Sequence, residues 1–248
     1  MSPSMTVIRW LGQACFLITT LMGTRALIDP PNPQVGYPIA AHSIPANIVF
    51  VSHEHPDHNY VQAAADIGTL KPTVIPPLPL SPDDEEQTGT YAFGPQGAEA
   101  EKLAFKRISA YHDNAEGARR GPDTITVLTT GGLRIVHMGD IGELKLLPEQ
   151  VQAIGRVDVL MIPVGGFFTV DGRQAAALVD QLRPRVIIPM HYGTPALNPS
   201  LKSRLAGPEA FLTAMQGKAQ VVHVHARDLK LSPKTLPATP TIYLLRYQ

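Results

Sequence analysis

The segment Ser52-His53-Glu54-His55-Pro56-Asp57-His58 constrains the fold and chemistry of this chain more than any other. It places three of the nine histidines and an aspartate within six positions. The apolar run Ile48-Val49-Phe50-Val51 precedes it and predicts a buried strand, so the cluster is expected on a loop at the carboxyl end of that strand. Loops in this position often carry the active sites of α/β proteins. The density of imidazoles predicts a metal site.

The spacing within the cluster predicts two pairs of ligands. In an extended loop, residues two apart face the same side, so His53 and His55 are expected to bind one ion. Asp57 and His58 follow the bend at Pro56 and are free to face a second ion. Imidazole and carboxylate ligands suit Zn²⁺, and also Mn²⁺ or Fe²⁺.

The composition narrows the class of partner. Lys plus Arg and Asp plus Glu each total 21 in the 248 residues, and this zero net charge argues against a nucleic-acid-binding surface. No stretch approaches the roughly 20 apolar residues of a membrane span, and the N-terminus lacks a signal-peptide pattern, so a cytoplasmic protein is expected. The lone Cys15 fits a reducing compartment, and its position in an apolar run predicts a packed side chain rather than a reactive thiol.

The first half of the chain reads mainly as strands. Short apolar or β-branched runs cover 6–11, 14–20 and 25–29, and residues 21–24 between the last two are typical of a hairpin turn. The Ala-rich segment 59–70 predicts a helix. Residues 72–97 combine five prolines before position 83 with the acidic run 83–86, which predicts a solvated surface loop, with a substrate lid as the alternative.

The second half starts again with strands and then alternates strand and helix. Gly131-Gly132 predicts a hairpin between strands at 124–129 and 133–137. The other predicted strands are 105–110, 157–163, 185–189, 220–224 and 241–245. Ala175, Leu178, Val179 and Leu182 have helical spacing, and a further helix is predicted over 208–216. Two halves that each run from strands to a helix predict two packed sheets with helices outside, in a single domain over 1–248.

Three further candidate ligands follow predicted strands. His112 comes after the strand at 105–110, Asp140 lies in the segment His137-Met138-Gly139-Asp140, and His191 lies in Pro189-Met190-His191-Tyr192-Gly193. A single histidine at a strand end is weak evidence for a ligand. Three such residues together with the 53–58 cluster form a specific set, about as many protein ligands as a two-metal site requires.

The chain resembles the metallo-β-lactamase superfamily. The matching residues are His53, His55, Asp57 and His58 of the H-x-H-x-D-H signature, followed by His112, Asp140 and His191 in the family's order. The stretches 133–140, 162–166 and 188–192 look like the single-domain metal-dependent hydrolases near ascorbate-6-phosphate lactonase. Residues 72–97 depart from that subfamily, in which a more regular strand and helix are expected.

The resemblance implies a four-layer αβ/βα sandwich of the α/β class, with two divalent metal ions, foremost Zn²⁺, where the sheets meet. It also implies the ligand roles. His53, His55 and His112 would hold the first metal, Asp57, His58 and His191 the second, and Asp140 would bridge them.

The remaining candidate residues are assigned more modest roles. His137 is expected to orient a ligand or to be packed. His223, His225 and His42 are expected to be structural or at the surface. Asn114 and Tyr192 adjoin ligands and are candidates for contact with a small-molecule substrate. Arg119, Arg120 and Lys145 could bind a phosphate, although exposed basic residues more often face solvent.

These patterns predict a binuclear metal-dependent hydrolase. Two ions would lower the pKa of a bridging water, and Asp57 is the carboxylate expected to orient the resulting hydroxide and take up a proton. A small ester or lactone is the first expectation for the substrate, from the subfamily resemblance, and a phosphodiester is the second. An iron redox centre and a non-catalytic metal-binding protein are the readings from other classes.

Overall fold

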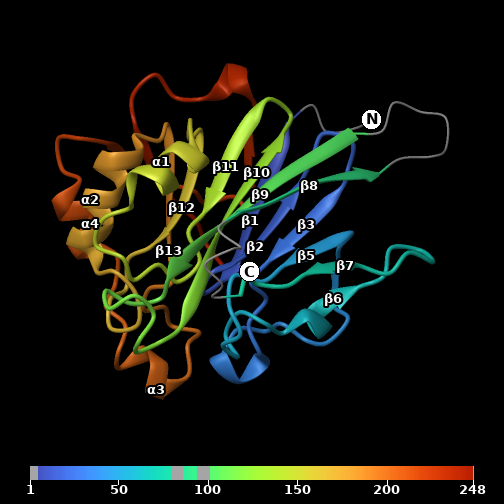
Figure 1. The fold of residues 1–248 in the computed structure, drawn as a ribbon, viewed down its shortest axis with the longest axis horizontal. Coiled ribbons are helices and arrows are strands. Elements are labelled where there is room, and N and C mark those ends of the chain that lie inside the picture. The colour runs from blue at the N-terminus through green and yellow to red at the C-terminus, as the bar shows by residue number, and fades with distance from the viewer. Residues whose placement is uncertain (1–4, 80–85, 94–100, 248) are drawn as a thin grey trace.

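The fold consists of two large mixed sheets, shown in Figure 1. The computed structural model describes residues 5–79, 86–93 and 101–247. The first sheet has six strands, which are in spatial order β15 (Leu229–Leu231), β1 (Thr6–Gly12), β2 (Cys15–Thr19), β3 (Arg25–Ile28), β5 (Ile48–Phe50) and β7 (Thr73–Ile75). The eight strands of the second sheet are β14 (Gln220–His223), β16 (Thr241–Leu244), β13 (Val186–Met190), β12 (Val159–Pro163), β11 (Leu133–His137), β10 (Pro122–Thr130), β9 (Glu101–Tyr111) and β8 (Glu86–Phe93).

The two sheets pack face to face, and their facing side chains form one hydrophobic cluster. Ile8 and Phe16 of the first sheet belong to this cluster together with Ile125 and Val136 of the second, and all four are almost fully buried. The predicted strands at 6–11, 157–163 and 185–189 are present as β1, β12 and β13; burial alternates over the first part of β1, and β12 and β13 are continuous buried runs. Cys15 is buried in β2, and burial raises the pKa of its thiol.

The hairpin predicted at Gly131-Gly132 and the helix predicted around 175–182 are confirmed. Gly131 and Gly132 join β10 to β11 with φ angles of 56° and 76°, a conformation that a two-residue hairpin requires and glycine adopts readily. Helix α2 (Gly172–Leu182) buries the predicted apolar face and is capped by Asp171, whose side chain accepts hydrogen bonds from two main-chain N–H groups. The other α-helices are α1 (Pro148–Ile154), α3 (Pro199–Lys202) and α4 (Glu209–Ala214).

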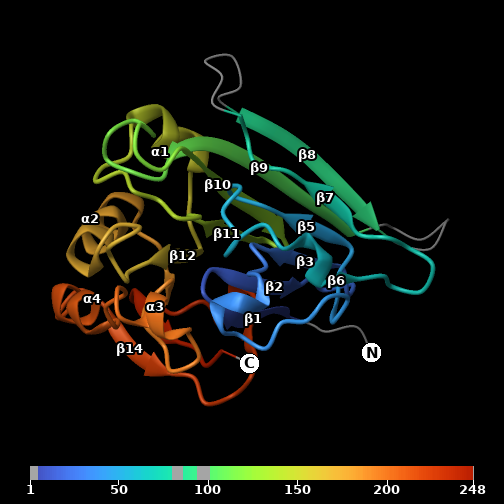
Figure 2. The ribbon, with the colours of Figure 1, turned by 90° about the horizontal axis from the view of Figure 1, so that it is seen from below.

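The outer layers of the two sheets differ. Figure 2 shows α1, α2 and α4 on the side of the second sheet, away from the first. The outer face of the first sheet, by contrast, is covered by loops, the 3₁₀ turns η1 (Pro33–Val35) and η2 (Val61–Ala63) and the small pair β4 (Ile44–Pro45) and β6 (Ala64–Ala65), which enclose a second hydrophobic cluster. A third 3₁₀ turn, η3, spans Pro233–Thr235. This is the predicted α/β sandwich, with irregular structure in place of one helical layer.

Two local predictions in the first half were wrong. The segment 59–70 is not an α-helix, because the carbonyl groups of Gln62, Ala63 and Ala65 accept hydrogen bonds from the 42–46 loop instead of from the next helical turn. The segment 72–97 is not simply a surface loop, since it contributes β7 and β8 to the edges of the two sheets. β7 pairs with β5, and β8 pairs with β9. Neither pairing can be recognised from the local sequence pattern. Residues 80–85 and 94–97 of this segment lie outside the described residues.

The described part of the chain contains no helix that is long and apolar enough to cross a membrane.

Candidate metal centre

All seven predicted ligands follow strands and meet at one end of the two sheets. The 53–58 loop follows β5 of the first sheet, and the other three follow strands of the second sheet, His112 after β9, Asp140 after β11 and His191 after β13. The fold thus brings together side chains that are up to 138 positions apart, between His53 and His191.

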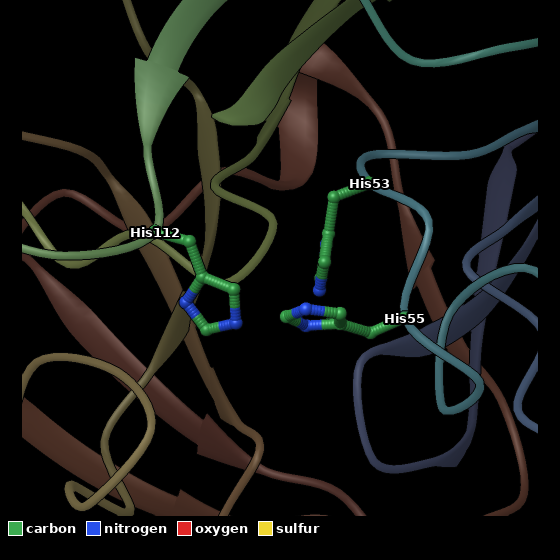
Figure 3. A group of neighbouring side chains, drawn as sticks. All are labelled: His53, His55 and His112. Atoms are coloured by element: carbon green, nitrogen blue, oxygen red, sulfur yellow. The ribbon is translucent and has the colours of Figure 1, made fainter. Parts of the chain in front are cut away.

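The seven side chains form two compact groups. In each group, one potential ligand atom from every member lies within 4.8 Å of the others. The first group consists of His53, His55 and His112, and the second of Asp57, His58, Asp140 and His191. Figure 3 shows the first group, with His53 and His55 reaching from the cluster loop and the ring of His112 facing them from the opposite side. His53 and His55 thus fall in one group, and Asp57 and His58 in the other.

Asp140 connects the two groups. Its Oδ2 lies 3.1 Å from His191 Nε2 and 3.3 Å from His58 Nε2 in the second group, and 3.4 Å from His112 Nε2 in the first. A single carboxylate oxygen therefore faces imidazoles of both groups. This is the position that a ligand shared between two ions would need.

The chemistry of the two groups fits divalent metal ions. The Nε2 atom of His53 and the Oδ1 atom of Asp140 are buried without a hydrogen-bond partner in the described part of the chain. Unpaired buried polar atoms are costly, and a bound cation would satisfy them. Imidazole nitrogens and carboxylate oxygens are also the ligand types that Zn²⁺ accepts.

Burial lowers the pKa of histidines in the first group, whereas neighbouring carboxylates raise the pKa of His191 in the second. Burial lowers the pKa of both His53 and His112 to about 4, so these imidazoles are neutral, as metal ligation requires. Burial also disfavours charge on His191, but Asp140 and Asp57 outweigh it and raise the pKa of His191 to about 9. In the second group, then, protons and metal ions compete for the same carboxylate-flanked site.

Asp29 holds the cluster loop in place and was not recognised from the sequence. This buried carboxylate accepts hydrogen bonds from the Ser52 N–H at 2.7 Å and the Ser52 hydroxyl at 2.6 Å, and lies 3.0 Å from His58 Nδ1. With Nδ1 bound in this way, Nε2 of His58 is turned towards the second group. The sequence signal available was an acidic residue at the end of the predicted strand 25–29.

Asp123 and His137, from strands of the second sheet, contact the turn that carries Asp140. Asp123 is fully buried, its Oδ1 lies 3.5 Å from His53 Nδ1, and burial raises the pKa of its carboxyl to about 7. It packs so closely on Gly139 that a Cβ there would come within 2.2 Å of Asp123 Oδ1. His137 Nε2 lies 2.8 Å from the Ala14 carbonyl, while Nδ1 accepts a hydrogen bond from the Gly139 N–H. His137 therefore positions the Gly-Asp turn, as one of its two predicted roles implied.

Like Asp29 and Asp123, Gln13 was not recognised from the sequence. It is fully buried, and its side-chain nitrogen lies 2.7 Å from His191 Nε2 and 3.1 Å from Asp57 Oδ2. Its main-chain carbonyl accepts a hydrogen bond from the His191 N–H at 3.1 Å. The turn between β1 and β2 thus contacts the second group through both side chain and main chain.

Three of these buried residues have left-handed backbone conformations, with φ angles of 50° for Gln13, 46° for Asp29 and 50° for His191. Such angles are uncommon and costly for residues other than glycine. Because all three residues lie at the two groups, we infer that tertiary contacts maintain these unfavourable conformations and thereby orient the side chains.

A pocket of about 140 Å³ opens beside the first group. Its lining comprises His112, Asp113, Asn114, Arg120, Gly142, Leu144, Phe168, Thr169 and Gln174. Of the two candidate substrate contacts, Asn114 lies in this lining. Tyr192 does not, because it is buried against Trp10 at a ring-centroid distance of 5.2 Å. Of the basic candidates, Arg120 lines the pocket.

Related proteins carry similar names. A UPF0173 metal-dependent hydrolase of Anaeromyxobacter sp. (strain K) is 34% identical over 238 residues, covering 87% of this chain and 83% of its own. A metal-dependent hydrolase of the same UPF0173 group from Thermococcus kodakarensis is 29% identical and covers 86% and 97%.

Solved structures and the family model agree with the observed fold. A Thermotoga maritima protein assigned to the metallo-beta-lactamase superfamily aligns with a TM-score of 0.66 and 26% identity, over 97% of this chain and 98% of its own. Igni18, a metallo hydrolase from Ignicoccus hospitalis, has a TM-score of 0.58 at 19% identity, with coverages of 92% and 98%, and shares the fold. The family model described as "Beta-lactamase superfamily domain" matches residues 7–191, and this chain belongs to that superfamily.

Proposed function

We propose that this protein is a binuclear metal-dependent hydrolase that acts on a small ester or lactone. The observation that carries the proposal is the pair of donor groups joined by Asp140, whose Oδ2 lies 3.1 to 3.4 Å from imidazoles of both. The relatives named as metal-dependent hydrolases support the reaction class. We assign His53, His55 and His112 to one metal, Asp57, His58 and His191 to the other, and Asp140 to both, with Zn²⁺ as the first candidate and Mn²⁺ or Fe²⁺ as alternatives.

Bound divalent ions would lower the pKa of a coordinated water and polarise the carbonyl or phosphoryl oxygen of a substrate. Asp57 is the member of the second group best placed to orient the attacking water and accept its proton, because its side chain is 22% exposed, whereas those of His58 and His191 are fully buried. Burial opposes ionisation of Asp57, but His58 and His191 hold its pKa well below the usual range, so the carboxylate is ionised at neutral pH.

The preference for an ester or lactone rests on the subfamily resemblance of the segments 133–140, 162–166 and 188–192. A phosphodiester is the second candidate, because the same donor groups would polarise a phosphoryl oxygen equally well. A polymeric nucleic acid is disfavoured by the equal totals of 21 basic and 21 acidic residues. We therefore expect a small molecule as the substrate.

The test is a panel of esters, lactones and phosphodiesters assayed on protein of known metal content, with Zn²⁺ and Mn²⁺ added back. Asp57→Ala and His112→Ala should each lose at least about 100-fold in kcat/KM on the best substrate. His225→Ala is the matched control, because His225 is exposed and belongs to neither group.

Three outcomes would contradict the proposal. Full activity of both variants on every substrate that the parent hydrolyses would remove the donor groups from the reaction. Full metal occupancy without turnover of any substrate in the panel would favour the non-catalytic metal-binding protein. Optical absorption from bound iron, together with redox activity, would favour the iron redox centre instead.

A further inference from the structure

The lining of the pocket beside His112 includes one arginine, Arg120, whose guanidinium can still bind an anion. The guanidinium of Arg120 donates one hydrogen bond, from Nη2 to the Phe167 carbonyl at 2.6 Å, and its Cζ lies 5.9 Å from the ring centroid of Phe168. Within the described residues it forms no ion pair. A guanidinium carries five N–H donors, so most of them remain for a ligand.

The acidic residue in the pocket lining, Asp113, already accepts hydrogen bonds from main-chain groups. Asp113 lies in the lining, but its two carboxylate oxygens accept hydrogen bonds from the main-chain N–H groups of the following loop, at 2.7 to 3.1 Å. These donors include the N–H of Arg120 itself. The carboxylate thus shapes the 113–120 loop and does not pair with the Arg120 guanidinium.

The rest of the lining suits the carbon skeleton and polar groups of a small molecule. Leu144 and Phe168 provide apolar surface, and Asn114 and Gln174 provide amides. His112 places the pocket directly against the first group of metal ligands. A ligand in the pocket would therefore have one end at Arg120 and the other at the candidate metal centre.

We propose that this pocket binds the anionic group of the substrate, a carboxylate or a phosphate, through Arg120, while the bond to be hydrolysed lies at the donor groups. This inference rests on the proposed hydrolase function and narrows it to small esters or lactones that carry a negative charge. Arg recognises both anions through paired N–H groups, so carboxylate and phosphate share this chemistry.

The test uses three esters that differ only in the group meta to the reacting acetate, namely 3-acetoxybenzoate, 3-acetoxyphenyl phosphate and the neutral 3-acetoxybenzamide. The metal-loaded wild-type protein should hydrolyse the better of the two anions with a kcat/KM about 10- to 100-fold above that for the amide, as expected for hydrogen bonds to a charged group. The ratio between the two anions identifies which one the pocket prefers.

Arg120→Gln should reduce the preference for anions to about onefold and leave kcat/KM for the neutral ester within about threefold of wild type. Arg120→Lys keeps the charge and should retain part of the preference. Arg119→Gln is the matched control, because Arg119 is the adjacent exposed arginine and does not line the pocket.

A binding measurement separates failure of this inference from failure of the hydrolase proposal. The ether analogues 3-ethoxybenzoate and 3-ethoxyphenyl phosphate cannot undergo ester hydrolysis at the ether oxygen, and at least one should bind metal-loaded wild-type protein about tenfold more tightly than Arg120→Gln by calorimetry. If that difference appears without hydrolysis of any ester, the anion pocket stands and the hydrolase proposal fails. If neither anion binds in an Arg120-dependent way, or if Arg120→Gln lowers charged and neutral esters equally, the anion pocket is overturned.

Discussion

The side-chain nitrogen of Gln13 lies 2.7 Å from Nε2 of His191, although the two residues are 178 positions apart in the chain. The same nitrogen lies 3.1 Å from Asp57 Oδ2. Gln13 therefore bridges two members of the second donor group from a turn of the first sheet. The main-chain bond from His191 to the Gln13 carbonyl fixes this contact further.

Replacing Gln13 should weaken metal binding at the second group. Gln13→Met keeps the approximate length of the side chain and removes its hydrogen bonding, so Asp57 and His191 lose their orientation. The expected loss of metal affinity is about 10-fold, in the range typical of residues that orient metal ligands. Competition with a chelating dye measures it, with the exposed Gln62→Met as the control. Equal affinities of the two variants would exclude a positioning role for Gln13.

Removing the carboxylate of Asp29 should destabilise the fold as well as the site. Asp29→Ala leaves the buried Ser52 N–H and the Nδ1 atom of His58 without their partner and removes one of the two partners of the Ser52 hydroxyl. The expected cost is about 3 kcal/mol of unfolding free energy, because buried polar groups and charges lose their compensation. Urea unfolding measures the cost. Asp180→Ala, which removes an exposed ion pair with Lys218, should cost less than about 1 kcal/mol.

Metal binding should raise thermal stability. If ions bind the folded state with free concentrations near 100 times Kd, each contributes about 2.7 kcal/mol, and for a chain of this size that corresponds to a rise in Tm of roughly 5 to 10 °C. Calorimetry in the presence of EDTA and after re-addition of Zn²⁺ measures the shift. His112→Ala should show a smaller shift than wild type, because it leaves the first group with two ligands. An unchanged Tm on adding Zn²⁺ would argue against ligation by either group.

Glu143 should make stability depend on pH. Burial raises the pKa of this carboxyl to about 7, above the ordinary value of 4.5, although Gln150 donates a hydrogen bond to it at 3.0 Å. The folded state therefore binds this proton more tightly than the unfolded state, and stability falls as pH rises from 4.5 to about 7. Glu143→Gln removes the ionisation, so the variant should be the more stable protein at pH 8, by roughly 1 kcal/mol after allowance for solvent screening.

The two proteins should differ little at about pH 4, where Glu143 is protonated in both states. Urea unfolding in EDTA at both pH values checks this, since the chelator removes the separate pH dependence of metal binding. A stability gap that is equal at the two pH values would assign the effect to packing instead.

Local patterns predicted the elements that depend only on residues close together in the sequence. The hairpin at Gly131-Gly132, the apolar runs of β12 and β13 and the amphipathic face of α2 are as expected, because each depends on residues that are near one another in sequence. The helix expected at 59–70 failed for the opposite reason. Its main-chain groups found partners in the 42–46 loop, and no local pattern records that competition.

The spacing from His53 to His58 is a local property, so the sequence was enough to predict two pairs of candidate donors, His53 with His55 and Asp57 with His58. Packing of the two sheets brought Asp29, Gln13 and Asp123, which no local pattern singled out, against these candidate donors. The same packing brought the guanidinium of Arg120 into a pocket lined by His112. These contacts arise because the loops that follow strands of both sheets meet at one end of the sandwich. Side chains distant in sequence become neighbours there, and the charge and hydrogen bonding of each depend on groups from other segments.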